Sequence, residues 1–351
     1  VRAVLMFGSA AWAPWVSSTV WSAIERVQLE AARVVGGTVK SAPREAVLAE
    51  AGLCELRRVA ESVWVCELEK CLRAPQGDPR REMACAVVRR RLVRRTDWRT
   101  AAWRLLRELL PDGVGRDGWM LSERPWCVWS GVEWLVDGER DADPSVCRER
   151  AMVLLRGLGT TDWVLYTDGS AVESVRCGGA GVVVTRGDPE LPERVFVGRY
   201  AAGVIASSYQ AELRALKEAL VWLHECESDW QSAVIVSDSQ AALGAMRNAG
   251  VVGAGRVSVG LGEVVQLGRE LGARGKRLVF VWVPGHCGLV GNEWADEAAR
   301  GAVLLDQGGV PCLYESVRSV CRRREVLVFE HERCRGVYGE GMKRDLEKGW
   351  D

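Results

Sequence analysis

Four acidic residues are the strongest candidates for chemistry in this sequence. Asp168 and Asp238 each follow a short apolar run of the kind that forms a buried strand. If the two strands are parallel neighbours, both aspartates lie at the edge of the sheet where α/β proteins usually bind ligands. Glu212 is expected one turn into a long helix, and Asp296 in the first turns of the last strongly predicted helix.

Each of these acids, taken alone, is expected to be an ordinary solvated charge. Four carboxylates that converge in a low-dielectric cleft repel one another unless a divalent cation offsets the repulsion. Hard oxygen ligands favour Mg²⁺, with Mn²⁺ as an alternative. The three histidines are isolated, which excludes a poly-histidine metal centre. The spacing of Cys312, Cys321, His331 and Cys334 lacks the short ligand pairs of zinc sites.

The elements that must position the four acids alternate between strand and helix over residues 162–302. Three strands joined by short turns predict an antiparallel meander, followed by a helix with Leu213, Leu216, Leu220 and Leu223 on one face. A strand, two helical stretches, another strand, a Pro-Gly loop and a final helix complete the order. This order predicts an α/β fold in which a five-stranded mixed sheet is flanked by helices.

Residues 162–302 resemble ribonuclease H of the type found in cellular enzymes and in retroelement polyproteins. Four short motifs carry part of the resemblance, all in the family's order: Tyr166-Thr-Asp-Gly-Ser170, Gly178-Gly-Ala-Gly-Val-Val183, Ala211-Glu-Leu213 and Val236-Ser-Asp-Ser239. The fifth motif is the specific one, because it is hard to obtain by chance: Pro284-Gly-His-Cys-Gly-Leu-Val-Gly-Asn-Glu-Trp-Ala-Asp296.

The resemblance implies a role for each of these residues. Asp168, Glu212, Asp238 and Asp296 would bind two Mg²⁺ ions that promote hydrolysis of a phosphodiester, leaving a 5′-phosphate and a 3′-hydroxyl. His286, on the loop before the last helix of the domain, would assist turnover near the scissile phosphate. The implied substrate is the RNA strand of an RNA–DNA hybrid, recognised through its 2′-hydroxyl groups.

Contacts to the nucleic acid are expected around the catalytic motifs. The candidates are Gly169, Ser170, Ser208, Tyr209, Gln210, Ser239 and Asn292. Cellular enzymes of the family have an Asn-rich sequence where this chain has Ser207–Gln210. Ser208, Tyr209 and Gln210 are expected to make the nucleic-acid contacts in place of those asparagines. Asn292 is also expected to cap the last helix of the domain.

The first part of the chain, residues 1–110, is predicted to be mainly α-helical and rich in arginine. Ten arginines against two acids lie between Arg80 and Arg107, with Trp98 and Trp103 interleaved. This window is expected either to grip phosphates and stack on bases or to be a solvated helix face. Three short stretches resemble the segment after the polymerase core of non-LTR retrotransposon reverse transcriptases: Phe7-Gly-Ser-Ala-Ala-Trp12, Ala31-Ala-Arg-Val-Val-Gly36 and Glu50-Ala-Gly-Leu53. No polymerase Tyr/Phe-x-Asp-Asp motif is present.

Composition bounds the remaining possibilities. The formal net charge is zero, but residues 1–161 carry +4 and residues 162–301 carry −4, so overall neutrality does not argue against a nucleic-acid partner. The absence of a secretory signal and of a long apolar stretch predicts an intracellular, nuclear or cytoplasmic protein with free thiols and no membrane partner. The start at Val1 rather than Met suggests a piece of a longer polypeptide.

The sequence therefore predicts four segments: the helical region 1–110, a loop-rich linker 111–161, the ribonuclease H domain 162–302 and an extension 303–351 without an assigned role. The predicted function is Mg²⁺-dependent cleavage of RNA in RNA–DNA hybrids, as part of a retroelement polyprotein with an upstream reverse transcriptase as partner. The alternative is a non-catalytic segment that keeps the fold and binds hybrids or serves as structure. All four acids and His286 are present, which favours the enzyme.

Overall fold

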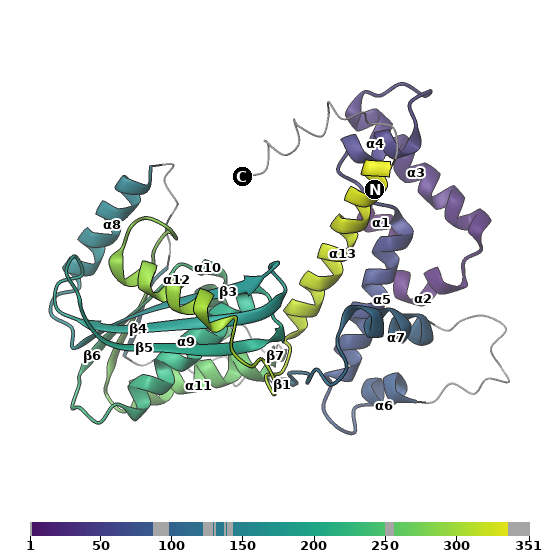
Figure 1. The fold of residues 1–351 in the computed structure, drawn as a ribbon. Coiled ribbons are helices and arrows are strands. Elements are labelled where there is room, and N and C mark those ends of the chain that lie inside the picture. Colours follow the sequence, from purple (N-terminus) through teal and green to yellow (C-terminus); the bar gives the residue numbers. More distant parts are fainter. Residues whose placement is uncertain are drawn as a thin grey trace. The chain divides into compact units, whose positions relative to one another are not determined.

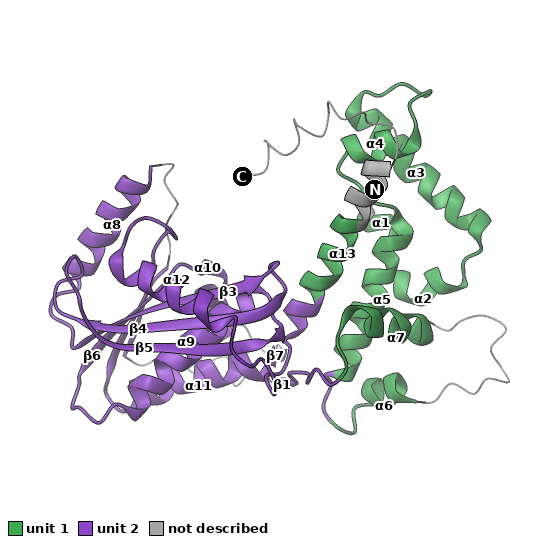
Figure 2. Cartoon of the chain, in the orientation of Figure 1, with its two compact units in different colours: residues 1–72, 76–112, 318–351 green, residues 73–75, 113–317 purple. Residues whose placement is uncertain are grey.

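The chain forms two compact units, shown in different colours in Figure 2. The computed structural model describes residues 2–86, 98–121, 129, 131–136, 138, 143–249 and 256–335, apart from the side chains of 2, 120, 121, 256 and 328–335. Unit 1 comprises Val1–Leu72, Gln76–Asp112 and Arg318–Asp351, and unit 2 comprises Arg73–Pro75 and Gly113–Val317.

The regular elements that the structure describes in unit 1 are all helices, as the sequence predicted for residues 1–110. Its elements are α1 (Arg2–Leu5), α2 (Ser9–Trp12), η1 (Ala13–Trp15), α3 (Ser18–Gly36), α4 (Arg44–Glu50), α5 (Leu56–Leu72), α6 (Pro79–Cys85), α7 (Trp98–Leu109) and most of α13 (Tyr314–Arg335). Helix α3 begins after Ser17, whose side chain accepts a hydrogen bond from the amide of Val20, and it is followed by Gly37 in the left-handed conformation. These are the usual chemical signals for starting and stopping a helix.

Unit 2 is built on a six-stranded mixed sheet (Figure 1). In spatial order the strands are β2 (Val132–Leu135), β8 (Arg277–Trp282), β6 (Ser232–Ser237), β3 (Trp163–Val172), β4 (Arg176–Arg186) and β5 (Glu193–Ile205). The predicted meander is confirmed, because β3, β4 and β5 pair antiparallel. The condition set for Asp168 and Asp238 is met, because β6 pairs with β3 in parallel, and β6 pairs in parallel with β8 as well.

The sixth strand is the main departure from the predicted five. Strand β2 comes from the stretch expected to be a loop-rich linker and pairs in parallel with β8. The same stretch supplies α8 (Pro144–Gly157) and strand β1 (Trp119–Leu121), which pairs with β7 (Arg256–Ser258) in a small second sheet. Strands of three or four residues are too short to show a hydrophobic period, so only their pairing partners reveal them.

Side chains of the central strands alternate between two cores. Leu165, Ile235 and Phe280 face α9 (Ser208–Glu225), α10 (Gln240–Ala249) and α11 (Val259–Ala273). Their immediate neighbours in the strands, among them Tyr166 and Val236, face α8 and α12 (Val290–Ala302). Figure 1 shows α9 and α11 on one side of the sheet and α12 on the other. Helices thus cover both faces of the sheet, as the parallel strands at its centre require.

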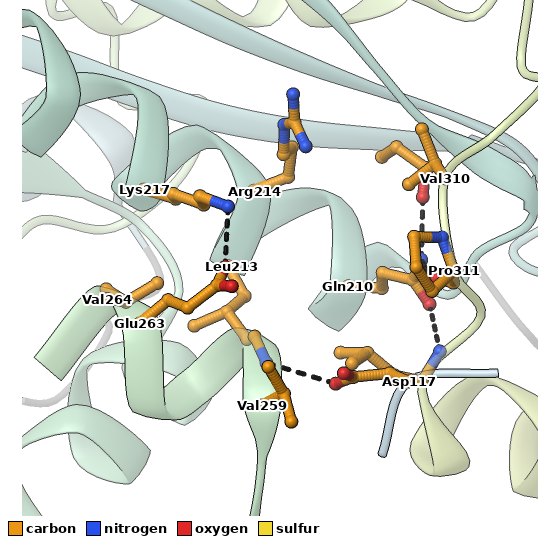
Figure 3. A pocket seen from close by; sticks show the side chains of 13 residues that line it. Asp117, Gln210, Leu213, Arg214, Lys217, Val259, Glu263, Val264, Val310 and Pro311 are labelled. Carbon is orange, nitrogen blue, oxygen red and sulfur yellow. Dashed lines mark hydrogen bonds and ion pairs between the residues drawn. The ribbon is translucent and has the colours of Figure 1, made fainter.

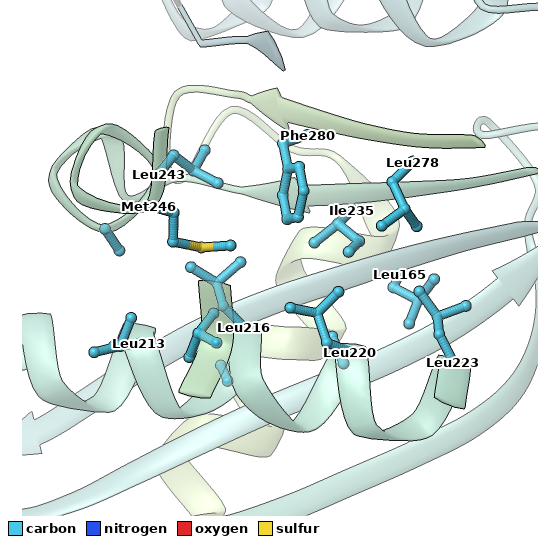
Figure 4. Packing of buried hydrophobic residues seen from close by; sticks show 14 of the residues in the cluster. Leu165, Leu213, Leu216, Leu220, Leu223, Ile235, Leu243, Met246, Leu278 and Phe280 are labelled. Carbon is cyan, nitrogen blue, oxygen red and sulfur yellow. The ribbon is translucent and has the colours of Figure 1, made fainter. Parts of the chain in front are cut away.

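Helix α9 contributes the apolar face that its spacing predicted. Leu216, Leu220 and Leu223 are at most 1% exposed and Leu213 is 3% exposed. In Figure 4 these side chains point from α9 toward Leu165 and Ile235 of the sheet. Burying a leucine stabilises the fold by about 1.5–3 kcal/mol, so this face holds α9 firmly on the sheet.

Helix α12 lies unusually close to strand β4 because glycines replace side chains at the crossing. A Cβ atom added at Gly181 would overlap the backbone of Ala295 and Ala299 in α12, and one added at Gly179 would overlap Ala299 and Val303. Gly179 and Gly181 of the Gly-Gly-Ala-Gly motif in β4 thus form a packing surface for the helix that carries Asp296. None of the described helices is both long and apolar enough to cross a membrane.

Substituting Gly181 by Ala should therefore destabilise the protein. The new methyl group must push α12 away from β4, at a cost of about 1–3 kcal/mol, the usual range for overpacking a tight interior. The control is Gly244→Ala on α10, where an added Cβ meets nothing within 4 Å. That change should be neutral or stabilise the helix by up to about 1 kcal/mol. Denaturant unfolding measures both, and equal stabilities of the two variants would contradict the packing argument.

Candidate active site

Asp168 and Asp238 are brought together by the register of the sheet. The parallel pairing of β3 with β6 ends at Thr167 and Ser237, the residues directly before the two aspartates. Strand β3 does not stop at Asp168 as expected, but continues to Val172 in its antiparallel pairing with β4. Asp168 is thus held by a continuous strand, while Asp238 follows the last residue of β6.

Glu212 reaches the two aspartates from the first turns of α9. The helix begins after Ser207, whose side chain accepts a hydrogen bond from the amide of Gln210. On the strand beside it, Gly169 allows close approach, because a Cβ atom there would overlap the backbone nitrogen of Glu212. As a result, Asp168, Glu212 and Asp238 each offer an oxygen within 4.8 Å of those of the other two.

Asp296 lies beside this trio and belongs to a second cluster. Its carboxylate, the carboxylate of Glu293 and the imidazole of His286 offer ligand atoms within 4.8 Å of one another. Asp296 also forms an ion pair of 2.7 Å with Arg300, one turn along the helix. Glu293 was not singled out from the sequence, although it stands three residues before Asp296 in the specific motif and therefore on the same helix face.

The electrostatics of the trio are those of crowded, buried acids. Burial and the charges of Asp238 and Asp296 raise the pKa of Asp168 from 3.8 to about 7. Burial and the charges of Asp168 and Asp238 raise the pKa of Glu212 well above its usual value. The protein by itself thus favours protonation of a site that is built from anionic ligands.

The donor set fits a divalent cation. Asp168 and Glu212 are 8% and 7% exposed, and Oε2 of Glu212 is buried without a hydrogen-bond partner. A buried carboxylate oxygen without a partner is costly, and a bound cation would remove that cost. Oxygen donors from three carboxylates suit Mg²⁺ or Mn²⁺ rather than zinc or copper.

His286 occupies the loop between β8 and α12. It is exposed, and its φ of 56° is a left-handed conformation that non-glycine residues seldom adopt. The preceding Gly285 packs against Asp238, because a Cβ there would lie 2.5 Å from Oδ2 of Asp238. The loop therefore packs closely against the carboxylate of Asp238, while the imidazole of His286 remains accessible to solvent.

The residues predicted to contact nucleic acid fall into different environments. Ser208 is exposed at the start of α9, while Gly169 and Ser170 are half-buried on β3 next to Asp168. Tyr209 is half-buried against the core, and burial raises the pKa of its hydroxyl to about 12. Ser239 is half-buried and accepts a hydrogen bond from the amide of Ala242, as a cap of α10 does.

The cap predicted at Asn292 is wrong, and Gln210 lies in a buried environment. Asn292 does not cap α12, because the helix begins at Val290 after Leu289, and Asn292 is buried inside it. Gln210 is 5% exposed, and its amide group is hydrogen-bonded to four protein atoms. That leaves Gln210 no free hydrogen-bonding position for a nucleic acid in this conformation.

Other candidate residues lie outside what the structure describes. Of the arginine-rich window, Arg89, Arg90, Arg91, Arg94 and Arg95 belong to the undescribed residues. The helices on either side of them are α6 and α7, and Trp103 of α7 donates a hydrogen bond to the carbonyl of Ala84. Of the cysteine and histidine set considered for zinc, Cys312 and Cys321 are buried, and His331 and Cys334 carry undescribed side chains.

The match to a known family agrees with this architecture. The family model described as RNase H matches residues 160–303. Among solved structures, RNase H1 of the archaeon Halobacterium salinarum NRC-1 is 25% identical, with 40% of this chain and 96% of that chain covered and a TM-score of 0.32. The N-terminal RNase H domain of a Mycobacterium tuberculosis protein is 22% identical, with 41% and 94% covered and a TM-score of 0.32.

A third similar structure is LC11-RNase H1 in complex with an RNA/DNA hybrid, 22% identical, with 40% of this chain and 99% of that chain covered and a TM-score of 0.32. Comparison with curated proteins gives no match. The fold and the carboxylate cluster define the class, an α/β domain whose buried carboxylates could hold a divalent cation. The family match assigns residues 160–303 to an RNase H domain.

The raised pKa of Asp168 predicts that the metal-free protein loses stability with rising pH. The folded state holds the proton up to about pH 7, whereas the unfolded chain releases it near 3.8, so stability falls as the pH rises between these values. Asp168→Asn removes the charge and should raise the melting temperature in EDTA at pH 8 by about 5 °C, with little effect at pH 4.

The control for this measurement is Asp229→Asn, because the side chain of Asp229 is 89% exposed. Adding Mg²⁺ at pH 8 should stabilise the wild type and the Asp229→Asn variant more than Asp168→Asn. An Asp168→Asn protein that melts no higher than the wild type in EDTA at pH 8 would show that the carboxylates do not repel one another as inferred.

Proposed function

We propose that this chain is a divalent-cation-dependent endonuclease that hydrolyses the RNA strand of RNA–DNA hybrids and leaves 5′-phosphate and 3′-hydroxyl ends. The observation that carries the proposal is the cluster of Asp168, Glu212 and Asp238, whose oxygens lie within 4.8 Å of one another in the domain matching the RNase H family. LC11-RNase H1, one of the similar structures, is in complex with an RNA/DNA hybrid.

Each side chain has a definite task in this proposal. Asp168, Glu212, Asp238 and Asp296 hold two Mg²⁺ ions, and Mn²⁺ is an acceptable substitute for them. When bound, such cations supply Lewis acidity toward the phosphate and the attacking water. The imidazole of His286 has a ring nitrogen within 4.8 Å of carboxylate oxygens of Asp296 and Glu293, and it is exposed on its loop. In this proposal it assists catalytic turnover near the scissile phosphate.

Residues beside the carboxylates bind the substrate and take no part in the hydrolysis itself. Ser208, at the exposed start of α9, and Ser170, two residues after Asp168, carry hydroxyl groups near the elements that hold the carboxylates. Such groups are suited to hydrogen bonds with the 2′-hydroxyls that distinguish RNA from DNA. The low exposure of Asp168 and Glu212 keeps water from screening the charges that act on the phosphate.

We further propose that the protein is part of a retroelement polyprotein in which a reverse transcriptase precedes it. The helical unit 1 and its arginine-rich window support this arrangement, because a basic helical segment before the nuclease would hold the hybrid that reverse transcription produces. The arginines would bind phosphates and the tryptophans would stack on bases.

Hybrid cleavage with Mg²⁺ tests the enzymatic proposal. Wild type should cut the RNA strand of a labelled hybrid, and Asp238→Asn should cut at least about a hundredfold more slowly, since it removes charge from the cation site. Asp229→Asn is the matched control, because its side chain is exposed and it is not one of the proposed cation ligands. Gel electrophoresis of 5′-labelled RNA gives the rates.

Two other results would contradict this proposal and support a different function. A wild-type protein that binds the hybrid but never cuts it would support the non-catalytic alternative. Equal cutting of duplex DNA would identify a DNA-cleaving enzyme with the same fold.

The arginine-rich window has its own test. Replacing Arg89–Arg91 and Arg94–Arg95 by Ala should weaken hybrid binding and flatten its salt dependence, by about 0.7–0.9 in the logarithmic slope for each phosphate that the arginines no longer neutralise. Fluorescence anisotropy at several salt concentrations gives the slope. If the slope does not change, these arginines form a solvated helix face.

A further inference from the structure

The side chain of Gln210 is fully engaged by the protein. Its Nε2 donates to the carbonyls of Ala202 (2.7 Å) and Pro311 (3.0 Å). Its Oε1 accepts from the amide of Leu313 and the hydroxyl of Ser316, both at 2.8 Å. A side-chain amide offers two donors and two acceptor positions, and here all four are used. In Figure 3, Gln210 of α9 lies beside Pro311 of the segment that follows α12.

The segment of residues 307–316, here called the strap, is fastened at two more points to the same region. The amide and the hydroxyl of Ser207, which precedes α9, lie 2.9 and 3.0 Å from the hydroxyl of Ser316. Oε1 of Gln307 accepts from the amide of Gly203 in β5 at 2.9 Å. Ser207, Gln210 and Ser316 are all buried, so water cannot readily replace these hydrogen bonds.

The other side of the strap is hydrogen-bonded to Arg73 and residues 115–117, which precede the strands of the sheet in the sequence. The amide of Cys312 donates to the carbonyl of Gly115, and the carbonyl of Cys312 accepts from the amide of Asp117. The guanidinium of Arg73, 3% exposed, donates to the carbonyls of both Asp117 and Cys312, at 2.8 and 2.6 Å. The two carbonyls stabilise the buried charge of Arg73. Moving the strap would break the hydrogen bond to Cys312, so Arg73 helps to hold the strap in place.

The first turn of α9 is therefore held from two sides. Gly169 of β3 approaches its backbone at Ala211 and Glu212, and the strap is bonded to Ser207 and Gln210. Glu212 follows Gln210 by two residues, so a shift of this turn moves its carboxylate relative to Asp168 and Asp238. The cluster tolerates little movement, because metal ligation requires the three carboxylates to stay close.

We propose that Gln210 is a positioning residue, and that the strap, which Gln210 anchors, sets the position of Glu212 for cation binding. The inference rests on the proposed function for the role of the cation. It gives residues 307–316, for which the sequence suggested no role, a place in the support of the active site. It also extends the functional domain beyond residues 160–303 to include Arg73, residues 115–117 and the strap.

The cavity beside the strap does not offer a competing explanation for Gln210. It has a volume of about 230 Å³ and is lined in part by Lys217 and Glu263, which form an ion pair of 2.6 Å (Figure 3). Arg214, whose Nε is buried in the lining, is ion-paired with Glu218 at 2.9 Å. Nε of Arg214 makes no hydrogen bond, but within the described residues each charged side chain of the lining has an ion pair or a hydrogen bond, so none points to a ligand. The four bonds of Gln210 are accounted for by the strap and β5.

The experiment compares Gln210→Met and Ser316→Ala in the full chain. Methionine keeps the length of the side chain and removes its four hydrogen bonds, whereas Ser316→Ala is a milder change that removes one hydroxyl. The matched control is Gln266→Met on α11, where the exposed amide bonds Glu270 of the same helix. Circular dichroism and melting curves establish that each variant is folded.

The first readout is amide hydrogen exchange without metal or nucleic acid. Peptides covering residues 208–216 should exchange about fivefold faster in Ser316→Ala, the factor that one net hydrogen bond provides, and at least fivefold faster in Gln210→Met. Peptides covering β6 should exchange as in the wild type. Unchanged exchange at residues 208–216 in a folded Gln210→Met protein would overturn the proposal, whether or not the wild type cuts hybrids.

The second readout is the Mg²⁺ concentration that gives half-maximal hybrid cleavage. It should rise about fivefold in Gln210→Met, with the KM for the hybrid unchanged and the rate restored at high Mg²⁺. Faster exchange with an unchanged Mg²⁺ midpoint would overturn the positioning role and leave the strap purely structural. If the wild type does not cut hybrids at all, the proposed function fails, and the midpoint of thermal stabilisation by Mg²⁺ tests the positioning role in its place.

Discussion

The structure of unit 2 depends on keeping three mutually repelling carboxylates together at one edge of a sheet. Asp168, Glu212 and Asp238 lie within 4.8 Å of one another, and burial raises the pKa values of the first two. Without a cation, such an arrangement destabilises the fold, since desolvation and like charge both oppose ionisation. The energy must come from the packing of the elements that carry the acids.

That packing is supplied by close contacts between backbones and by large apolar faces. Strands β3 and β6 pair in parallel up to the residues before the two aspartates, so their separation is set by the sheet. Four leucines hold α9 on the same sheet, and glycine at 169 lets its first turn approach β3. Glycines of β4 let α12 approach in the same way, which places Asp296 beside the trio. Rigid elements can hold a repulsive cluster that loops could not.

The sequence was most informative where chemistry and periodicity agree. The leucine face of α9 was predictable because a 3.6-residue period reports which side chains are buried. The antiparallel meander was predictable because short turns join its three strands. The sequence was less informative for Asn292, since an asparagine near a helix start is usually a cap, yet α12 begins two residues earlier. For Gln210, the position before the helical glutamate suggested a substrate contact, whereas most of its partners lie about a hundred residues away in the strap.

The sequence alone determined which residues carry the candidate chemistry and which elements bear them, because acid identity, motif order and hydrophobic period are local properties. The tertiary structure decided how the acids divide into a trio and a His286, Glu293 and Asp296 cluster. It also decided that β2, Arg73 and the strap complete the domain. Edge pairing and buried side-chain hydrogen bonds join residues far apart in the chain, and no local pattern records them.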